Sequence, residues 1–192
     1  MGKVNLRESV RRSEDARFVS GRGTYIDDIQ VSDCAVGVFI RSPHAHARIN
    51  GFEKSKALKH EGVLAVITGA DWAELGFGVI PTNSAVKENT DGTPIFVPER
   101  PCLAAERVRY VGEPVAVVIA ETGSLAREAA ELLEVDYEPL EAVTHPVKTL
   151  EQGAPQIHDD IPGNLCVYWE LGDAKATERE LSESDHVVTL EL

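Results

Sequence analysis

The chain has 192 residues, of which 43% are hydrophobic and 27% are charged, and these proportions are typical of a globular protein. Its 32 acidic and 19 basic residues give a net charge of −13. A surface this negative repels phosphate groups, so nucleic acids and anionic membranes are unfavourable partners. No apolar run approaches the roughly 18 residues that cross a membrane, and the charged start lacks the hydrophobic centre of a secretory signal.

The three cysteines, Cys34, Cys102 and Cys166, lie far apart in the sequence. An odd number without a C-x-x-C pair argues against a disulfide framework and favours a reducing compartment, so we expect a cytoplasmic protein. An iron–sulfur cluster takes four protein ligands, which excludes a cluster held by this chain alone.

The first part of the chain is predicted to be an arm that leads into strands. Residues 1–19 are charged and weakly periodic, which predicts an extended arm. Two glycines in GRGTYIDDI (21–29) predict a turn into a strand. ARINGF (47–52) predicts a further strand. The stretch 33–42 alternates, which predicts a strand with one face formed by Cys34, Val36, Val38 and Ile40.

The middle of the chain alternates between regular elements and one long irregular segment. Residues 53–62 predict a short helix that Gly62 closes, and the apolar run 63–68 predicts a buried strand. Residues 76–101 are rich in glycine, proline and small polar residues and lack periodicity. We expect an excursion over the surface there, and such long loops are often functional or contact a neighbour.

A strand, a helix and another strand are predicted next, at 114–120, 122–135 and 134–140. The helix has a candidate cap at its start, Thr122 or Ser124. Its apolar spacing predicts a buried stripe formed by Leu125, Ala129, Leu132 and Leu133.

The last part of the chain changes in character. Residues 138–164 are rich in proline and acidic residues, which predicts a connecting arm. A strand at 166–171, a helix at 172–185 and a strand at 186–192 follow. The final strand has an apolar face, and such a strand with free edges invites pairing, so we expect it to pair with another molecule or to be loosely held.

The motif with the most chemical interest is RSPHAHARI, in which His44 and His46 stand two residues apart. On a strand both imidazoles would share one face, but a zinc site requires at least three protein ligands. The remaining histidines are scattered singly, at His60, His145, His158 and His186. We therefore favour a strand–turn–strand segment whose polar atoms are satisfied locally over a metal site.

Other candidate motifs are incomplete. Ser42 and His44 could form a nucleophile and a base, but no acid lies near enough in the sequence to orient the histidine. Gly21 and Gly23 lack the third glycine of a dinucleotide fingerprint. Glu113, beside a predicted buried strand, could be a buried acid or a hydrogen-bond anchor. We favour the anchor, because burying an unpaired charge is costly.

The ordered set of segments resembles the start of molybdenum hydroxylase large subunits. This family includes the large subunits of carbon monoxide dehydrogenase, xanthine dehydrogenase and aldehyde oxidase. The resemblance extends from about residue 10 to residue 192. It is carried by RSEDARFVSGRGTYIDDI, RSPHAHARI, GVLAVITGAD, PCLAAERVRYVGEPVAVVIAE, AREAAELLEVDYEPLEAV and GNLCVYWELGDAKA, in that order.

The resemblance implies an α+β fold in four parts. These would be an N-terminal arm (1–19), an α/β hammerhead domain (20–140), a linker arm (141–164) and the beginning of a molybdopterin-binding domain (165–192). The histidine motif would then be a structural signature of the hammerhead, in agreement with the interpretation from spacing.

The resemblance also implies a molybdenum–molybdopterin cofactor for the full-length family member, FAD and 2Fe-2S subunits or domains as partners, and a homo-oligomeric complex. In the family, the pterin contacts and the catalytic glutamate lie beyond the position that corresponds to residue 192, so we assign no catalytic, cofactor-binding or metal residue. We expect a structural domain that binds no cofactor alone. The alternative is a free-standing acidic binding or assembly module that reuses the fold, and the sequence leaves open a carbon monoxide, purine, aldehyde or other heterocyclic substrate.

Overall fold

The computed structural model describes residues 12–29 and 31–190. Residues 1–11, most of the expected N-terminal arm, lie outside that part. The chain divides into two compact units, Met1–Ala35 and Val36–Leu192. No helix in the described part is long and apolar enough to cross a membrane.

The first unit contains two short helices, α1 (Asp15–Val19) and a 3-10 helix (Ile26–Asp28). The Phe18 and Tyr25 rings stack between them, with centroids 5.7 Å apart. The Tyr25 N–H donates to the Asp28 carboxylate over 2.8 Å and closes a helical turn. The prediction of a strand after the glycines of residues 21–29 is therefore wrong. The prediction of an extended arm is wrong over α1, which is helical.

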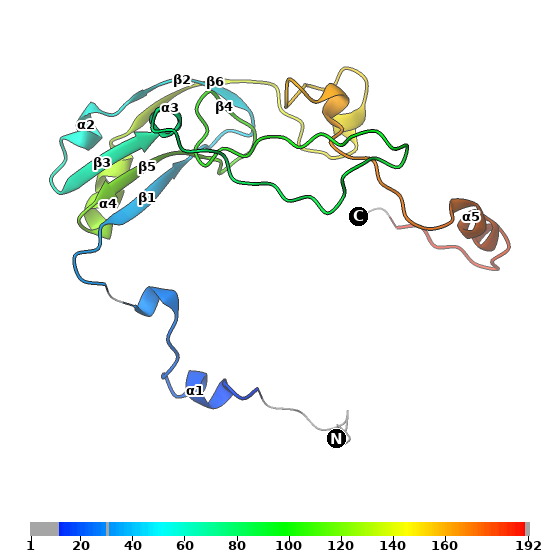
Figure 1. Ribbon diagram of the computed structural model, residues 1–192, viewed down its shortest axis with the longest axis horizontal. Coiled ribbons are helices and arrows are strands. Elements are labelled where there is room, and N and C mark those ends of the chain that lie inside the picture. Colours follow the sequence, from blue (N-terminus) through cyan, green and yellow to red (C-terminus); the bar gives the residue numbers. More distant parts are fainter. Residues whose placement is uncertain (1–11, 30, 191–192) are drawn as a thin grey trace. The chain divides into compact units, whose positions relative to one another are not determined.

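The second unit contains two three-stranded antiparallel sheets (Figure 1). The first sheet has the order β1-β5-β3 and consists of β1 (Val36–Arg41), β5 (Pro114–Ala120) and β3 (Val63–Thr68). All three were predicted, although β1 begins after Cys34. The central strand β5 is the most buried, as its continuous apolar sequence predicted.

Helix α4 (Gly123–Glu131) packs on this sheet, next to β1 and β5 (Figure 1). Its first turn is capped by Thr122, whose hydroxyl accepts the Leu125 N–H over 3.3 Å. The buried stripe differs from the predicted one, because Ala126 takes the place predicted for Leu132, and Leu132 is 36% exposed. The helix ends early because the next strand begins at residue 134.

The second sheet has the order β4-β2-β6 and consists of β4 (Arg107–Val108), β2 (Ala47–Glu53) and β6 (Glu134–Pro139). Strands β2 and β6 were predicted, whereas the two residues of β4 are too few to show a pattern. Phe52, Ile40 and Val135 touch the apolar cores of both sheets and join them. The first core contains Ala57, Val66, Ala116, Val118, Ala129 and Leu133, and the second contains Ala47, Ile49, Ala104, Val108 and Val115.

Two short helices flank β3. Helix α2 (Ser55–Leu58) occupies only part of the predicted helix, and α3 (Gly69–Glu74) was not predicted. At the start of α3 the Thr68 hydroxyl accepts the Asp71 N–H, while the Asp71 carboxylate accepts the Thr68 N–H over 2.8 Å. This capping box, together with Lys54 on both Asp71 oxygens at 2.9 and 2.8 Å, holds the helix against the sheet.

The remaining segments are mostly irregular. Residues 76–101 contain only an isolated bridge from Glu88 to Pro94, in agreement with the predicted excursion. Helix α5 (Ala174–Ser182) is confirmed. The strand predicted at 166–171 is wrong, since that segment hydrogen-bonds partly to side chains. The strand predicted at 186–192 is also wrong over residues 186–190, and residues 191–192 lie outside the described part. The fold is α+β, as expected.

Candidate functional site

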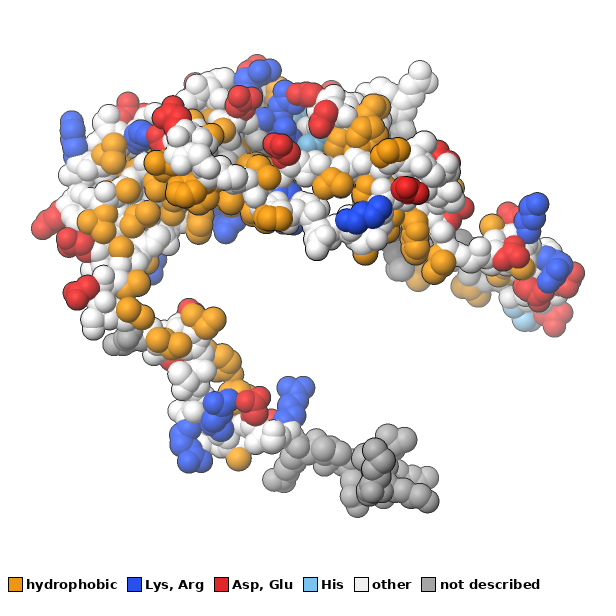
Figure 2. All heavy atoms as spheres, viewed as in Figure 1, with side chains coloured by type: hydrophobic (Ala, Val, Ile, Leu, Met, Phe, Trp, Pro, Cys, Tyr) orange, Lys and Arg blue, Asp and Glu red, His pale blue; other side chains and the backbone are white. Residues whose placement is uncertain are grey.

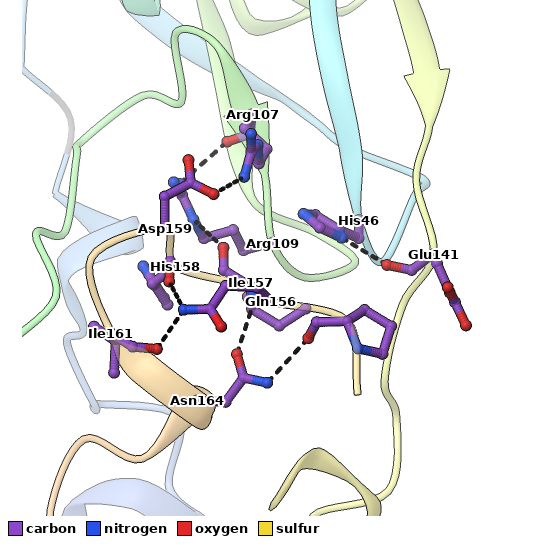
Figure 3. A network of polar contacts seen from close by, with 11 residues as sticks. His46, Arg107, Arg109, Glu141, Gln156, Ile157, His158, Asp159, Ile161 and Asn164 are labelled. Atoms are coloured by element: carbon purple, nitrogen blue, oxygen red, sulfur yellow. Dashed lines mark hydrogen bonds and ion pairs between the residues drawn. The ribbon is translucent and has the colours of Figure 1, made fainter. Parts of the chain in front are cut away.

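A network of polar contacts joins residues 155–164 to the strand β4 and the turn after it (Figure 3). Arg107 Nη1 lies 2.9 Å from Asp159 Oδ1, and Arg109 Nε donates to the Ile157 carbonyl over 3.2 Å. The Arg107 side chain is 20% exposed and that of Asp159 is 75% exposed, so the pair is shielded from water on the arginine side alone. The segment that sequence predicted as a connecting arm is therefore held against the second sheet.

Side-chain amides give this docked segment its shape. Asn164 Oδ1 accepts the Ile157 N–H over 2.9 Å, and Asn164 Nδ2 donates to the Pro155 carbonyl over 3.0 Å (Figure 3). Gln156 Nε2 donates to the His158 carbonyl over 2.7 Å. Ile161 is then turned inward and is 1% exposed. The segment combines satisfied backbone groups with an apolar anchor, which makes it an ordered part of the domain.

The two histidines of the RSPHAHARI motif have separate structural roles. His46 is 5% exposed, and its Nδ1 lies 2.7 Å from the Glu141 carbonyl, so Nδ1 carries the proton and donates it to that oxygen (Figure 3). His44 packs edge-on against the Tyr137 ring, with centroids 5.0 Å apart. His46 thus fastens the start of the docked arm, while His44 packs against β6.

Ser42 is satisfied locally, as expected. Its hydroxyl accepts the His44 N–H over 3.0 Å and donates to the His44 carbonyl over 3.1 Å. The serine therefore contacts the histidine backbone and does not form a nucleophile–base pair with the imidazole. Across residues 12–29 and 31–190, no three His, Cys, Asp or Glu side chains gather where they could hold a metal. We derive no catalytic step from these residues.

Glu113 is an anchor, as its position predicted. Its carboxylate is buried and accepts the Arg109 N–H over 2.5 Å, which closes the turn between β4 and β5. On the other side of the turn, the Ser42 N–H donates to the Glu113 carbonyl over 2.9 Å. Burial raises the pKa of the Glu113 carboxyl above its usual value, although the Arg109 N–H and guanidinium act in the opposite direction.

This raised pKa predicts a pH dependence of stability. The folded chain holds the Glu113 proton more tightly than the unfolded chain does. The carboxyl therefore contributes stability below its unfolded pKa, and this contribution is lost as the pH rises through the folded value. Glu113→Gln keeps the acceptor oxygen and removes the titration. We expect the variant to lose less stability than the natural chain between about pH 4 and 7 in urea unfolding.

The control for this experiment is Glu151→Gln, at an exposed position in the arm. Its pH profile should follow that of the natural chain. If the Glu113→Gln profile also followed it, the buried carboxyl would not be a source of the pH dependence.

A polar hollow of ≈ 340 Å³ lies beside the docked segment. Arg107, Arg109, His158, Asp159 and Asp160 form part of its lining, together with Glu99 and Glu106. Burial and the nearby Arg109 guanidinium lower the pKa of His158, which keeps the imidazole neutral at neutral pH. Carboxylates outnumber the arginines in the lining, and both arginines lie within reach of acidic side chains, which suits the hollow to ion pairing.

The comparison with protein families decides what kind of domain this is. Residues 20–141 match the family model of the aldehyde oxidase and xanthine dehydrogenase a/b hammerhead domain. The chain belongs to this family. The hammerhead thus comprises the two sheets with α2, α3 and α4, and the match reaches the residue that His46 binds, Glu141.

Relatives of this hammerhead include the large subunits of molybdenum-dependent oxidoreductases. The carbon monoxide dehydrogenase large chain of Afipia carboxidovorans is 35% identical over 92% of this chain and 22% of its own length. The nicotine 6-hydroxylase large subunit of Paenarthrobacter nicotinovorans is 37% identical over 94% of this chain and 21% of its own length. The chain therefore spans about a fifth of the length of these relatives.

Solved structures of related enzymes have the same fold as this chain. The Cu,Mo-CO dehydrogenase in its carbon monoxide reduced state matches 92% of this chain and 22% of its own, with a TM-score of 0.72 and 34% identity. Quinoline 2-oxidoreductase from Pseudomonas putida 86 matches 82% of this chain and 19% of its own, with a TM-score of 0.69 and 39% identity. The chain is a domain of the molybdenum hydroxylase family, and relatives of it are molybdopterin enzymes.

Proposed function

We propose that this chain is the N-terminal structural part of a molybdenum hydroxylase large subunit, and that it positions the domains that carry the molybdenum cofactor. The observation that supports this role best is the docked arm. Arg107, Arg109 and His46 fasten residues 141–164 to the hammerhead, and residues 165–190 follow that arm directly. A fixed arm sets the place and direction in which the following polypeptide leaves the hammerhead.

The same proposal divides the chain into four parts. Residues 1–19 are an arm, 20–140 the hammerhead, 141–164 the linker and 165–192 the beginning of the molybdopterin-binding domain. In this proposal the chain has no catalytic, cofactor-binding or metal residue of its own. The chemistry belongs to the cofactor, which other domains hold and orient.

The proposed partners follow from the type of enzyme. They are the remainder of the molybdopterin-binding subunit and FAD and 2Fe-2S subunits or domains, in a homo-oligomeric cytoplasmic complex. One relative is described as a subunit of a dehydrogenase complex, and another as a large molybdopterin subunit. The substrate class of such a complex is carbon monoxide, a purine, an aldehyde or another heterocycle.

A hybrid large chain tests this function. This sequence replaces the aligned region of the carbon monoxide dehydrogenase large chain from Afipia carboxidovorans, to which it is 35% identical. We expect the hybrid to assemble and to carry molybdenum by elemental analysis, because the hammerhead and its arm supply the same support. The chain alone should contain no stoichiometric molybdenum, iron or flavin.

Two results would contradict the proposal. One is a hybrid that folds but fails to assemble or to retain molybdenum when the natural large chain does so in parallel. The other is stoichiometric molybdenum in the purified chain alone.

A further inference from the structure

Two segments far apart in the sequence lie side by side beyond the second sheet. The Phe96 N–H donates to the Cys166 carbonyl over 2.9 Å, and the Thr90 N–H donates to the Tyr168 carbonyl over 2.9 Å. The Tyr168 N–H in turn donates to Asn89 Oδ1 over 2.8 Å. The long excursion is therefore fixed to the segment that follows the docked arm, and together they form a preordered wall.

This wall borders an apolar hollow of ≈ 440 Å³ that is open to solvent. The apolar part of its lining is Val86, Ile95, Phe96, Val97, Pro98, Val167 and Trp169, and the remaining lining residues are Thr82 and Ser84. In the described part of the chain, none of the lining residues is charged. Figure 2 shows apolar side chains at the surface along the segment that leads to α5.

The apolar lining is far more exposed than a core would be. Phe96 is 44% exposed, Val97 47%, Val167 43% and Trp169 55%. Single exposed apolar residues are ordinary, but a contiguous group held in place by hydrogen bonds is typical of a binding surface. The lining therefore favours an occupant that is itself apolar.

The chemistry of the hollow favours a polypeptide over a small molecule. Small-molecule sites combine an apolar wall with a few convergent polar groups that fix orientation. In this hollow the Ser84 hydroxyl already donates to the Val86 carbonyl over 2.7 Å. A charged ligand would lose its hydration without gaining a partner. Apolar side chains of a protein need no such partner.

We propose that this hollow receives apolar side chains from the polypeptide that molybdenum hydroxylase large subunits carry beyond the region this chain covers. This rests on the proposed function. The chain matches only 22% of the carbon monoxide dehydrogenase large chain, so about four fifths of that relative is further polypeptide, which is available to pack against the hammerhead. Its wall is preordered, as a docking surface for a fixed domain requires.

The first test places a carboxylate in the hollow of the hybrid large chain. Val97→Asp is compared with Leu58→Asp on α2, because Val97 is 47% and Leu58 46% exposed. In the chain alone the two variants should have similar unfolding midpoints. In the hybrid, Val97→Asp should unfold about 2–4 °C below Leu58→Asp, because only there is the new carboxylate buried by the occupant.

The second test measures access to the hollow directly. The thiol of Val97→Cys and that of Leu58→Cys are alkylated with iodoacetamide and followed by peptide mass spectrometry, in the chain alone and in the hybrid. Alkylation at position 97 should be about tenfold slower in the hybrid, whereas alkylation at position 58 should change little.

The outcomes separate the two proposals. If the unmodified hybrid fails to assemble, the proposed function fails and the docking surface falls with it. If the hybrid assembles but position 97 stays as reactive as in the chain alone, the function stands and the docking surface is wrong. A hybrid in which Val97→Asp equals Leu58→Asp in stability would also overturn the docking surface.

Discussion

Gly69→Ala is expected to destabilise the chain by about 1–3 kcal/mol, although the same substitution usually favours a helix. Gly69 is the buried first residue of α3. An added Cβ would lie 2.5 Å from the Ala104 carbonyl carbon and 2.6 Å from the Ala105 nitrogen, distances that real side chains do not tolerate. Both obstacles are backbone atoms, so no side chain can rotate away.

The opposing backbone is also fixed in place. Ala104 is 1% exposed, and its N–H donates to the Pro114 carbonyl at the start of β5 over 2.8 Å. The clash must therefore displace α3 or strain its junction with β5. We expect this cost to exceed the gain in helix propensity from glycine to alanine, which is about 1 kcal/mol.

Urea unfolding monitored by circular dichroism measures this effect. The control is Gly78→Ala, because an added Cβ there meets no atom within 4 Å and its backbone has no positive φ. That variant should be neutral or slightly stabilising. Equal stability of the two variants would mean that the close approach of α3 to residues 104–105 does not exist in solution.

The sequence predicts the regular elements of the hammerhead well, because their signals are local. The continuous apolar run of β5 and the spacing of α4 each show within a few residues. The capping box of Thr68 and Asp71 was also visible in the sequence and could have predicted α3. In contrast, the two residues of β4 are too few for any periodicity.

The candidate site could be predicted only in part. Glu113 was expected to anchor a turn, because it stands between a glycine and a buried strand. The partners of the docked arm were not predictable, since His46 and Glu141 are 95 residues apart and Arg107 and Asp159 are 52 apart. Such contacts depend on how the two sheets and the arm meet. A single sequence contains no periodic signal for that arrangement.

The same limitation explains the wrong strand at 166–171. Its alternation is real, but three of its five hydrogen bonds to residues 89–96 involve the side chains of Asn89 and Thr90 in place of the backbone of a neighbouring strand. Alternating residues there face the hollow and the solvent. An alternating pattern, which usually indicates one face of a sheet, can thus also occur in an extended segment with one apolar side.

Ile161→Ala is expected to destabilise the chain by about 2–5 kcal/mol and to loosen the docked arm first. Ile161 is the largest fully buried side chain outside the two sheet cores, and it is 1% exposed. Removing most of its side chain leaves a cavity under residues 155–164. The polar contacts of Arg107 and Arg109 alone would then hold this segment against the second sheet. The loss of stability should therefore be concentrated in the arm.

Hydrogen exchange with mass spectrometry separates local from global loosening. Exchange over residues 155–164 should rise in Ile161→Ala, while exchange over β5 rises only as far as global stability falls. The matched control is Leu150→Ala in the same arm, where the side chain is 59% exposed and its loss should cost little. If both variants exchanged alike over residues 155–164, Ile161 would not be the anchor. The ion pair and the hydrogen bonds alone would then fix the place where the polypeptide leaves the hammerhead. Because the Asp159 side chain is 75% exposed, a moderate rise in salt concentration would weaken that ion pair.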